Sequence, residues 1–352
     1  MTSAFSDAAM TYFYGHLFAA EPEVQAMFPA AMDAQRHRLA AALTRITARD
    51  PALAGWLGDL GRAHRKFGVR PEHLDVFRQS LEVTVRRYAG QQEAESIMDA
   101  FDWAVSVMDR AAADDAARSP AWWLAEVTGH EVRGPDVAVL TLATDRPYPY
   151  RPGQHTSVQT PRWPRLWRPY SIAGEPRQDG TLTLHVRAVP GGLVSSTLVH
   201  HTRPGDTLLL GGAAGAMTAL AGDGPDVLCL AGGTGLAPLK AIIEAVSRST
   251  APGRRREIVL YAGARTEADL YDLPALRRME LDYPWLQVLP VTSEQNIPGV
   301  MYSTIPQAAA AAHWADRDVY ISGPDEMITA TLRVLTDAGA SPDRLHYDLP
   351  AR

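Results

Sequence analysis

Two short stretches near the middle of the chain combine residue types that suit a flavin nucleotide. They read Arg168-Pro169-Tyr170-Ser171 and Gly191-Gly192-Leu193-Val194-Ser195. In the first, the Tyr170 ring could lie against an isoalloxazine, the Ser171 hydroxyl could hydrogen-bond its polar edge, and the Arg168 guanidinium could pair with a phosphate. In the second, Gly191 and Gly192 would let backbone N–H groups approach a phosphate ahead of a helix N-terminus. Taken singly, each stretch also fits an ordinary strand end or loop.

A third candidate binding segment follows an apolar run. Residues 227–230 predict a buried strand, residues 231–238 read Ala-Gly-Gly-Thr-Gly-Leu-Ala-Pro, and the segment from Leu239 to Val246 predicts a helix. This strand-loop-helix context is what a glycine-rich phosphate loop requires. The loop has the form Gly-Gly-x-Gly-x-x-Pro and differs from the dinucleotide fingerprint Gly-x-Gly-x-x-Gly. Because a glycine-rich loop between a strand and a helix can hold a phosphate, we expect a nucleotide to bind here.

The first part of the chain, residues 1–118, predicts helices. It is rich in alanine, and its apolar residues recur at spacings of three and four. His64 stands four residues after Leu60 on one such apolar face, so the two share that face. A lone histidine in this position is usually a packed core residue. The apolar pattern therefore predicts a helical bundle, and His64 is a candidate metal ligand only together with other residues.

The pattern changes after residue 118. Residues 119–222 show short alternating strands separated by turns, which predict a small antiparallel barrel. Residues 223–352 alternate apolar strands with helices, as in a doubly wound parallel sheet. We therefore predict three domains, an all-α domain, an antiparallel β-barrel and an α/β doubly wound domain, with these boundaries.

Composition limits the classes of function. The chain has 352 residues and a formal net charge of -6, which argues against nucleic acid as a main partner. A single cysteine, Cys229, excludes an intrachain disulfide and a cysteine-based metal cluster. The sequence has no long apolar run of the kind that predicts a membrane span. Its start also has no basic leader of the kind that predicts export. We expect a cytoplasmic protein, and a monomer.

Taken together and in this order, the two central motifs and the nucleotide loop resemble the ferredoxin-NADP reductase superfamily. The helical part is similar to a bacterial globin, because Tyr14, Phe28, Gln35, Leu39 and His64 fall in the order and approximate spacing of its haem-pocket residues. A globin joined to such a reductase resembles the flavohaemoglobins. The resemblance implies three cofactors, haem b, FAD and NAD(P)H.

The resemblance also implies a role for each matched residue. His64 would be the proximal haem ligand, Phe28 would pack against the porphyrin, Tyr14 and Gln35 would be distal hydrogen-bonding residues, and Leu39 would restrict the pocket. The implied FAD contacts are His155, Arg168, Tyr170, Ser171, Arg187, Gly191, Gly192, Val194 and Ser195. The implied NAD(P)H contacts are Gly232, Gly233, Thr234, Gly235, Pro238, Arg265, Gly323 and Pro324. Arg265 suits either a 2′-phosphate or an unrelated salt bridge, so the choice between NADH and NADPH stays open.

The activity implied by the resemblance is nitric oxide dioxygenase, in which O2 and NO give nitrate and NAD(P)H supplies electrons through FAD. Two alternatives remain. One is a flavohaem reductase with another electron donor or acceptor. The other is a haem-based gas sensor whose ligand state controls the reductase. These three functions share the cofactors and differ in what the haem does.

The chain departs from the flavohaemoglobin pattern on the proximal side. Relatives usually have a lysine before the proximal histidine, where this chain has Ala63, and a tyrosine ten residues after it, where this chain has Leu74. That tyrosine and a glutamate polarise the imidazole in relatives, and here Asp114 and Asp115 lie in the neighbourhood of the glutamate. A weaker acceptor would change the basicity of the histidine and so the properties of the iron.

Two further departures lie at the ends of the chain. The segment before Tyr14 is short for the first globin helix, so either the start is truncated or that helix is absent. The C-terminal sequence lacks the aromatic residue that relatives place close to the flavin, and we expect nicotinamide access to differ.

Overall fold

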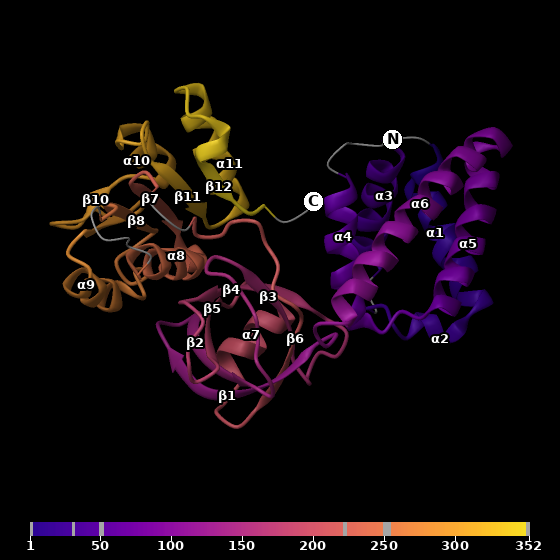
Figure 1. Ribbon diagram of the computed structural model, residues 1–352, viewed down its shortest axis with the longest axis horizontal. Helices are drawn as coiled ribbons and strands as arrows, with labels where there is room; N and C mark the ends of the chain where they lie inside the picture. The colour runs from indigo at the N-terminus through magenta and orange to yellow at the C-terminus, as the bar shows by residue number, and fades with distance from the viewer. Residues whose placement is uncertain (1–2, 30–31, 49–52, 221–223, 249–254, 350–352) are drawn as a thin grey trace. The chain divides into compact units, whose positions relative to one another are not determined.

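The computed structural model describes residues 3–29, 32–48, 53–220, 224–248 and 255–349 (Figure 1). The chain divides into two compact units between Trp122 and Trp123. The first unit is helical. The second contains a closed antiparallel barrel followed by a parallel sheet with helices. This order confirms the predicted fold class, whereas the domain boundaries stay predictions.

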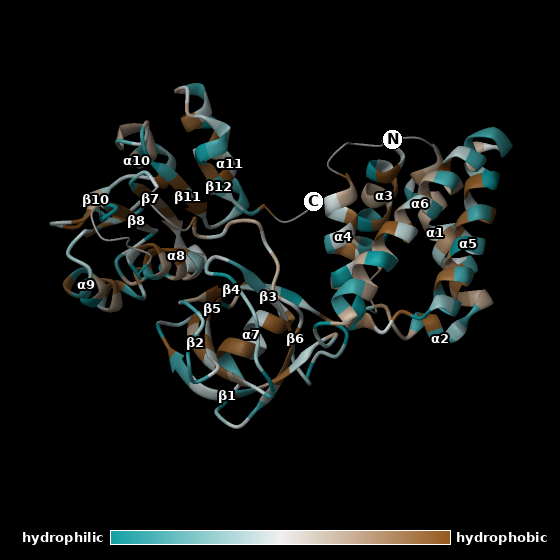
Figure 2. Cartoon of the chain, in the orientation of Figure 1, coloured by the Kyte–Doolittle hydropathy of each residue, from teal (hydrophilic) through white to brown (hydrophobic). Residues whose placement is uncertain are grey.

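The helical unit begins with the 3-10 turn η1 (Ser3–Phe5). Its helices are α1 (Asp7–Ala20), α2 (Pro22–Gln25), α3 (Asp33–Ala48), α4 (Leu53–His64), α5 (Pro71–Ala89) and α6 (Gln91–Ala116), with the 3-10 turn η2 (Arg65–Phe67) after α4. Ser6 caps α1, since its hydroxyl accepts a hydrogen bond from the Ala9 N–H. Pro22 and Pro71 stand at the first helical position, where a missing N–H costs least. The helices alternate hydrophilic and hydrophobic residues around their circumference (Figure 2).

The position of His64 depends on close packing between α4 and α6. A Cβ atom at Gly61 would overlap the backbone carbonyl of Met108, so only glycine lets these two helices approach so closely. Leu53 and Leu57 on the same helix are fully buried against α6. The α4 helix is therefore fixed along its length, and His64 is its last residue.

The barrel consists of β1 (Trp123–Val132), β2 (Val137–Thr144), β3 (His155–Gln159), β4 (Arg168–Ala173), β5 (Thr181–Arg187) and β6 (Thr207–Leu210). The strands close in the order β1-β2-β5-β4-β3-β6, and neighbouring strands run antiparallel. Alternate residues point inward, and the short helix α7 (Leu193–His200) packs Leu198 onto this core. The N-terminus of α7 is thus held beside the barrel.

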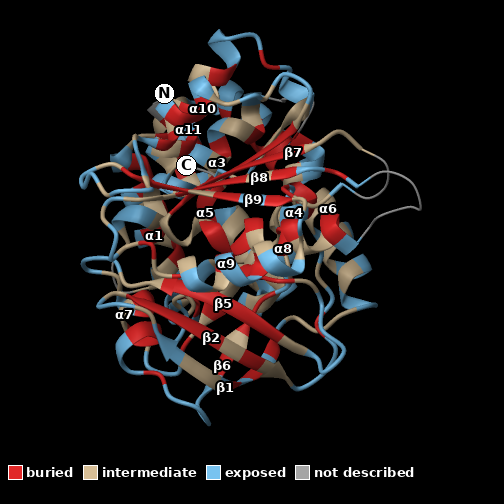
Figure 3. Cartoon of the chain, turned by 90° about the vertical axis from the view of Figure 1, so that its left-hand side faces the viewer, coloured by how far each residue is buried: buried red, intermediate tan, exposed pale blue. Residues whose placement is uncertain are grey.

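The α/β part contains a six-stranded parallel sheet. Its strands are β7 (Val227–Gly232), β8 (Ile258–Ala264), β9 (Leu286–Thr292), β10 (Met301–Tyr302), β11 (Asp318–Ser322) and β12 (Leu345–Tyr347), in the spatial order β10-β9-β8-β7-β11-β12. Its helices are α8 (Leu236–Arg248), α9 (Leu273–Asp282), α10 (Ile305–Ala311) and α11 (Asp325–Asp337), and the short turns η3 (Gly233–Gly235) and η4 (Pro342–Arg344) complete it. Helices α8 and α9 cover one face, and α10 and α11 cover the other. Strand β7 is buried at every residue, and most residues of its neighbours β8 and β9 are buried (Figure 3).

The strand order reverses direction between β7 and β11. In an open parallel sheet, the carboxyl ends of the strands on either side of such a switch point form a crevice that binds ligands. The glycine-rich loop lies at this point and is shorter than the sequence suggested. Strand β7 continues through Gly232, and α8 begins at Leu236, ahead of the predicted start.

In the part of the chain that the structure describes, no helix combines the length and the apolar character that crossing a membrane requires.

Candidate functional site

The predicted distal residues of the globin unit form one group. The Tyr14 side chain on α1 is 4% exposed, and its ring packs edge-on against Phe28, with ring centroids 5.5 Å apart. Gln35 on α3 hydrogen-bonds the Tyr14 hydroxyl. Leu39, one turn later on α3, packs against the same buried cluster. The structure therefore brings together all four residues that the sequence assigned to this side.

Burial sets the protonation state of Tyr14. It raises the pKa of the phenol to about 12, against smaller opposing effects of the Gln35 hydrogen bond and the Arg38 charge. Tyr14 is therefore a neutral hydrogen-bond donor at physiological pH. A buried donor of this kind suits a ligand atom that carries partial negative charge.

His64 ends helix α4 and is oriented by its own helix. Its Nδ1 lies 2.7 Å from the carbonyl oxygen of Leu60, and this acceptor fixes the proton on Nδ1. Burial lowers the pKa of the imidazole, so the ring is neutral at neutral pH. The Nε2 lone pair is then the one that can ligate a metal, and the Phe67 ring packs edge-on at 5.7 Å.

Of the two carboxylates that lie in the neighbourhood of the missing glutamate, Asp115 has another partner. Asp115 forms an ion pair with Arg65, whose other nitrogen donates to the Ser119 carbonyl at 2.7 Å. The acceptor that the structure shows for the His64 imidazole is instead the Leu60 carbonyl. A neutral imidazole with an oriented Nδ1–H, in a unit that also holds a buried phenol donor, fits a haem with one protein ligand.

The flavin motif lies on two paired strands of the barrel. His155 on β3 pairs with Ser171 on β4, and Thr156 pairs with Tyr170. Because neighbouring residues of a strand point to opposite faces, Tyr170 and Ser171 lie on opposite faces of the sheet. Burial raises the pKa of Tyr170, and its ring packs against the barrel core. The structure thus brings His155 and Ser171 together on one face, with Tyr170 on the other.

The phosphate loop that follows β5 admits only glycine at its centre. A Cβ atom at Gly192 would lie 2.9 Å from the Val189 carbonyl oxygen and overlap the Ser195 hydroxyl, and Gly191 has a φ of 73°. The Ser195 hydroxyl closes the loop, lying 3.3 Å from both the Val189 nitrogen and the Gly192 carbonyl. Gly192 caps α7 without a side-chain hydrogen bond. Backbone N–H groups at a helix N-terminus fit a pyrophosphate.

Val194 has a different environment from the one that a phosphate contact suggests. Its side chain is 1% exposed and belongs to the barrel core. Only its backbone N–H is therefore available to a bound phosphate.

Arg187 lies at the junction of the barrel and the parallel sheet. Its Nη1 is 2.8 Å from Asp136 and 3.4 Å from Asp269, and a Cβ atom at Gly233 would be 4.0 Å from its Nε. The sequence assigned Arg187 to flavin phosphates. The structure places it beside the glycine-rich loop of β7, so the flavin role stays a prediction.

That glycine-rich loop is in tight contact with the turn after β11. A Cβ atom at Gly235 would overlap the Ser322 carbonyl oxygen, and one at Gly232 would overlap the Met327 sulfur. Gly323 and Pro324 form this turn, and Pro324 precedes α11. The predicted residues from β7 and β11 therefore meet at the switch point, as a nicotinamide site requires.

Three residues predicted in this region have distinct surroundings. Pro238 lies in the first turn of α8, where a backbone N–H would have no acceptor within the helix, so proline is tolerated there. Its side chain is buried and packs in the protein interior. Thr234 is half-buried in the loop. Arg265 is exposed just after β8. The predicted contact of Arg265 with NAD(P)H stays a prediction.

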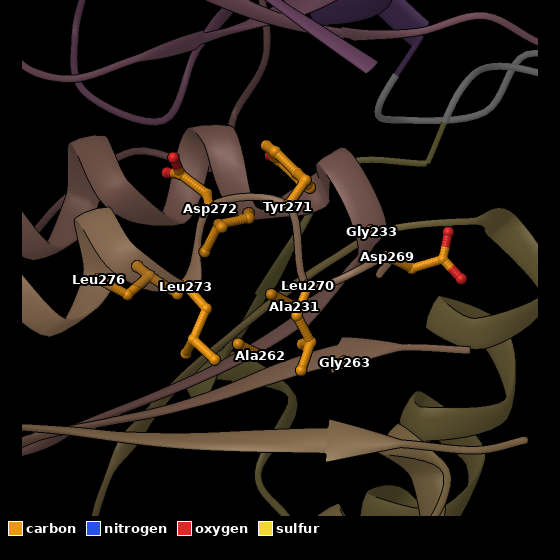
Figure 4. A pocket seen from close by; sticks show the side chains of 11 residues that line it. Ala231, Gly233, Ala262, Gly263, Asp269, Leu270, Tyr271, Asp272, Leu273 and Leu276 are labelled. Atoms are coloured by element: carbon orange, nitrogen blue, oxygen red, sulfur yellow. The ribbon is translucent and has the colours of Figure 1, made fainter. Parts of the chain in front are cut away.

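A small pocket opens at the carboxyl ends of β7 and β8 (Figure 4). It is lined by Ala231, Gly233, Leu236, Ala262, Gly263, Asp269, Leu270, Tyr271, Asp272, Leu273 and Leu276. The segment 269–276, which forms one wall, is not among the residues predicted from the sequence. Its signal was available, because leucines recur every third residue at positions 270, 273 and 276 directly after β8.

Comparison with protein families assigns a match to each part of the chain. Residues 11–108 match the globin family, residues 124–218 match the oxidoreductase FAD-binding domain, and residues 229–333 match the oxidoreductase NAD-binding domain.

Curated relatives match the reductase part. The ferredoxin–NAD(P)+ reductase component of the naphthalene 1,2-dioxygenase system of Pseudomonas putida is 32% identical over 219 residues, which cover 60% of this chain and 64% of that protein. The electron transfer component of the xylene/toluene monooxygenase of the same species is 34% identical over 162 residues, covering 46% of this chain and 45% of that protein. The chain thus spans less than two thirds of the length of these relatives.

Solved structures match both parts. The flavohaemoglobin of Malassezia yamatoensis, with bound FAD and haem, superposes with a TM-score of 0.79 at 17% identity, covering 97% of this chain and 93% of that one. The ferredoxin reductase of a carbazole 1,9a-dioxygenase superposes with a TM-score of 0.60 at 28% identity, covering 66% of this chain and 70% of that one. The first likeness establishes a shared fold over almost the whole chain.

The three matched domains imply haem, FAD and NAD(P)H as cofactors. The residues described above fit each of them: a neutral histidine for the iron, a helix N-terminus for a flavin pyrophosphate, and a glycine loop at a switch point for the nicotinamide dinucleotide. The chain joins a domain that matches the globin family to domains that match the FAD-binding and NAD-binding domains of oxidoreductases, and its fold resembles that of a flavohaemoglobin.

Proposed function

We propose that this chain is a flavohaem oxidoreductase that consumes NAD(P)H and converts nitric oxide and oxygen to nitrate. The observation that carries the proposal is the hydrogen-bonded pair of Tyr14 and Gln35 in the globin unit. It supplies a neutral, buried donor of the kind that favours a polarised oxygen ligand over a less polar gas.

The cofactors carry the electron chemistry, with NAD(P)H as the source, FAD as the converter from two-electron to one-electron transfer, and haem as the gas-binding centre. The protein contributes binding, orientation and exclusion of water. On the haem side, His64 would hold the iron through Nε2. The Tyr14 hydroxyl would donate a hydrogen bond to the oxygen ligand. Phe28 and Leu39 would make the pocket apolar and narrow.

On the flavin side, backbone groups do most of the binding. The N–H groups at the start of α7 would hold the pyrophosphate, and Gly191 and Gly192 keep the approach open. Arg168, at the start of β4, is exposed and would pair with a phosphate. His155 and Ser171 share one face of the β3–β4 pair, where a ring could be hydrogen-bonded. This arrangement supports a bound FAD at the barrel.

The test is rapid mixing of the reduced, oxygen-loaded protein with nitric oxide. We expect stoichiometric nitrate and loss of the oxygen-bound spectrum, followed by re-reduction when NAD(P)H is present. A protein that binds both gases and yields no nitrate would contradict the dioxygenase activity and leave the oxidoreductase assignment in place.

A second candidate function is a reductase that delivers electrons to another acceptor. It is favoured by the curated relatives, whose reductase components serve dioxygenase and monooxygenase systems according to their names. Steady-state NADH oxidation by the full chain with cytochrome c as acceptor, compared with NADH oxidation under nitric oxide and oxygen, would separate the two functions. The dioxygenase proposal requires the gas-dependent rate to exceed the rate with cytochrome c.

We also propose a cytoplasmic monomer as the working form. The single cysteine, Cys229, is fully buried in β7, and burial raises the pKa of its thiol, as suits a packed thiol without a disulfide partner. Light scattering of the purified chain would contradict the monomer if it gave twice the expected mass.

A further inference from the structure

The segment 269–273, which forms one wall of the pocket at the carboxyl ends of β7 and β8, is tied to the barrel at three points. Asp269 lies 3.4 Å from Arg187, Tyr271 lies 2.7 Å from His185, and Asp272 lies 2.6 Å from Arg133. The three partners come from strand β5 and from the residue after β1, which are barrel elements. One short segment therefore links the two halves of the reductase.

Asp272 is the most buried of these links. Its side chain is 2% exposed, and while one carboxylate oxygen meets Arg133, the other lies 2.5 Å from the Lys240 ammonium group on α8. A buried carboxylate between two cations is expensive to disrupt, because removing its charge deprives Lys240 of this partner and leaves Arg133 with its exposed partner Glu131. Asp272 thus joins the barrel, the pocket wall and helix α8 at one point.

The Tyr271–His185 link is a hydrogen bond between neutral groups. His185 is 5% exposed, and burial lowers its pKa to about 3, while burial raises the pKa of Tyr271 well above its ordinary value. Neither group changes charge near neutral pH. This link is therefore insensitive to pH near neutrality.

The same segment presents an apolar side to the pocket. Figure 4 shows Leu270 and Leu273 directed toward Ala231 and Ala262 at the strand ends, while the carboxylates of Asp269 and Asp272 point away from them. The polar side chains thus hold the barrel, and the leucines shape the space beside the glycine loop. Moving the segment would therefore change both its contacts with the barrel and the shape of the pocket.

We propose that Asp272 and Tyr271 are positioning residues, which hold the segment 269–273 against the flavin barrel and so set the shape of the pocket for the nicotinamide dinucleotide. The inference rests on the proposed use of NAD(P)H, and it takes the pocket at the carboxyl ends of β7 and β8, which Gly233 of the glycine-rich loop also lines, as part of the dinucleotide site. It adds that this site is completed by contacts with the barrel, and that the parallel sheet alone does not make it.

The experiment compares two substitutions around one guanidinium group, in the full chain loaded with FAD and haem. Asp272→Asn removes the buried partner of Arg133, and Glu131→Gln removes its exposed partner, which lies 2.5 Å away with 65% of its side chain exposed. Isothermal titration with NAD+ and with NADP+ gives the affinity of each protein. We expect Asp272→Asn to weaken binding of the preferred dinucleotide about five-fold or more, and Glu131→Gln to leave it unchanged.

A gentler variant and two further measurements keep the result decisive. Tyr271→Phe removes one hydroxyl group, so it tests the segment even if Asp272→Asn does not fold. We expect it to weaken dinucleotide binding in the same direction, with FAD affinity unchanged at a temperature where thermal unfolding shows the protein to be fully native. Equal losses of FAD and dinucleotide affinity, or wild-type dinucleotide affinity in both variants, would overturn the positioning role. A wild-type chain that binds FAD and neither dinucleotide would overturn the proposed site as well.

Discussion

The Nδ1 atom of His64 lies 2.7 Å from the carbonyl oxygen of Leu60, one turn earlier on the same helix. The imidazole of His64, the proposed haem ligand, is thus oriented by a neutral backbone group. Leu74 is aliphatic and offers no acceptor, and Asp115 is engaged by Arg65. A carbonyl is a weaker acceptor than a carboxylate, so it would give the imidazole less imidazolate character and make it a less basic ligand for a haem iron.

The first prediction concerns this ligand bond. In the ferrous, ligand-free protein, the iron–histidine stretch measured by resonance Raman should lie at lower frequency than in a flavohaemoglobin that keeps the tyrosine–glutamate pair. Asp115→Asn should not move it, because that carboxylate pairs with Arg65. A frequency as high as in such a relative, or a shift in the Asp115→Asn protein, would place an anionic acceptor on the imidazole.

The second prediction separates the globin from the reductase. His64→Ala should abolish haem uptake, since it removes the nitrogen that would ligate the iron, while NAD(P)H oxidation with ferricyanide continues at the wild-type rate. His73→Ala is the matched control, because His73 is a half-buried histidine near the start of α5, beside Arg70. Haem absorbance after reconstitution is the measurement. A normal five-coordinate spectrum in the His64→Ala protein would assign the ligand to another residue.

The third prediction concerns oxygen release. Tyr14→Phe removes a donor worth roughly 1.5 to 3 kcal/mol when its acceptor carries charge, which corresponds to about one to two powers of ten in the dissociation rate. Carbon monoxide, a poorer acceptor, should respond far less. Flash photolysis and rapid mixing give both rates, and equal changes for the two gases would mean that Tyr14 acts by shape.

The pH dependence of the same rate follows from the pKa of Tyr14. Because the pKa of the folded protein is raised to about 12, the phenol stays protonated well past its ordinary pKa. The raised pKa means that the protonated phenol contributes to the stability of the folded protein. This contribution is fully present below the ordinary pKa of tyrosine, and it is lost as the pH rises through about 12. Oxygen release should therefore be flat from neutral pH to about pH 10. A step near pH 8 would show that another group controls the rate.

The sequence could predict those parts of the site that depend on local chain geometry. Gly192 and Gly235 stand where a Cβ atom would overlap neighbouring atoms, and a glycine-rich run between a strand and a helix is visible in the sequence. The order of the residues also indicated that Tyr14 lies on a segment before the one that carries Gln35 and Leu39. These features depend on near neighbours in the chain or on motif order.

The sequence could not reveal the contacts that tie the pocket wall to the barrel. Asp272 meets Arg133 across more than a hundred positions, and no local pattern records such a pair. The sequence shows that Val194 is apolar, but it does not show that the side chain faces the barrel core. In a short helix after a loop, the hydrophobic pattern is too short to define which face is buried. Tertiary packing decides both.

The last prediction uses two glycines to separate the nucleotide sites. At Gly192 an added Cβ would lie 2.9 Å from the Val189 carbonyl oxygen, so Gly192→Ala must displace the loop that leads into α7. At Gly235 it would overlap the Ser322 carbonyl, so Gly235→Ala must separate the β7 loop from the turn after β11. We expect the first to weaken FAD binding at least ten-fold, about 1.4 kcal/mol, with a smaller effect on the dinucleotide, and the second to do the reverse.

Gly55→Ala is the control for adding a methyl group, because a Cβ atom at this position on α4 would have no neighbour within 4 Å among the described residues. It should leave both affinities unchanged and stabilise the helix by about 0.5 to 1 kcal/mol. FAD affinity is measured by flavin fluorescence and dinucleotide affinity by calorimetry, in the same preparations. If Gly192→Ala and Gly235→Ala lowered the two affinities in equal proportion, the glycines would maintain the fold of the whole reductase unit, and the assignment of one cofactor to each loop would fail.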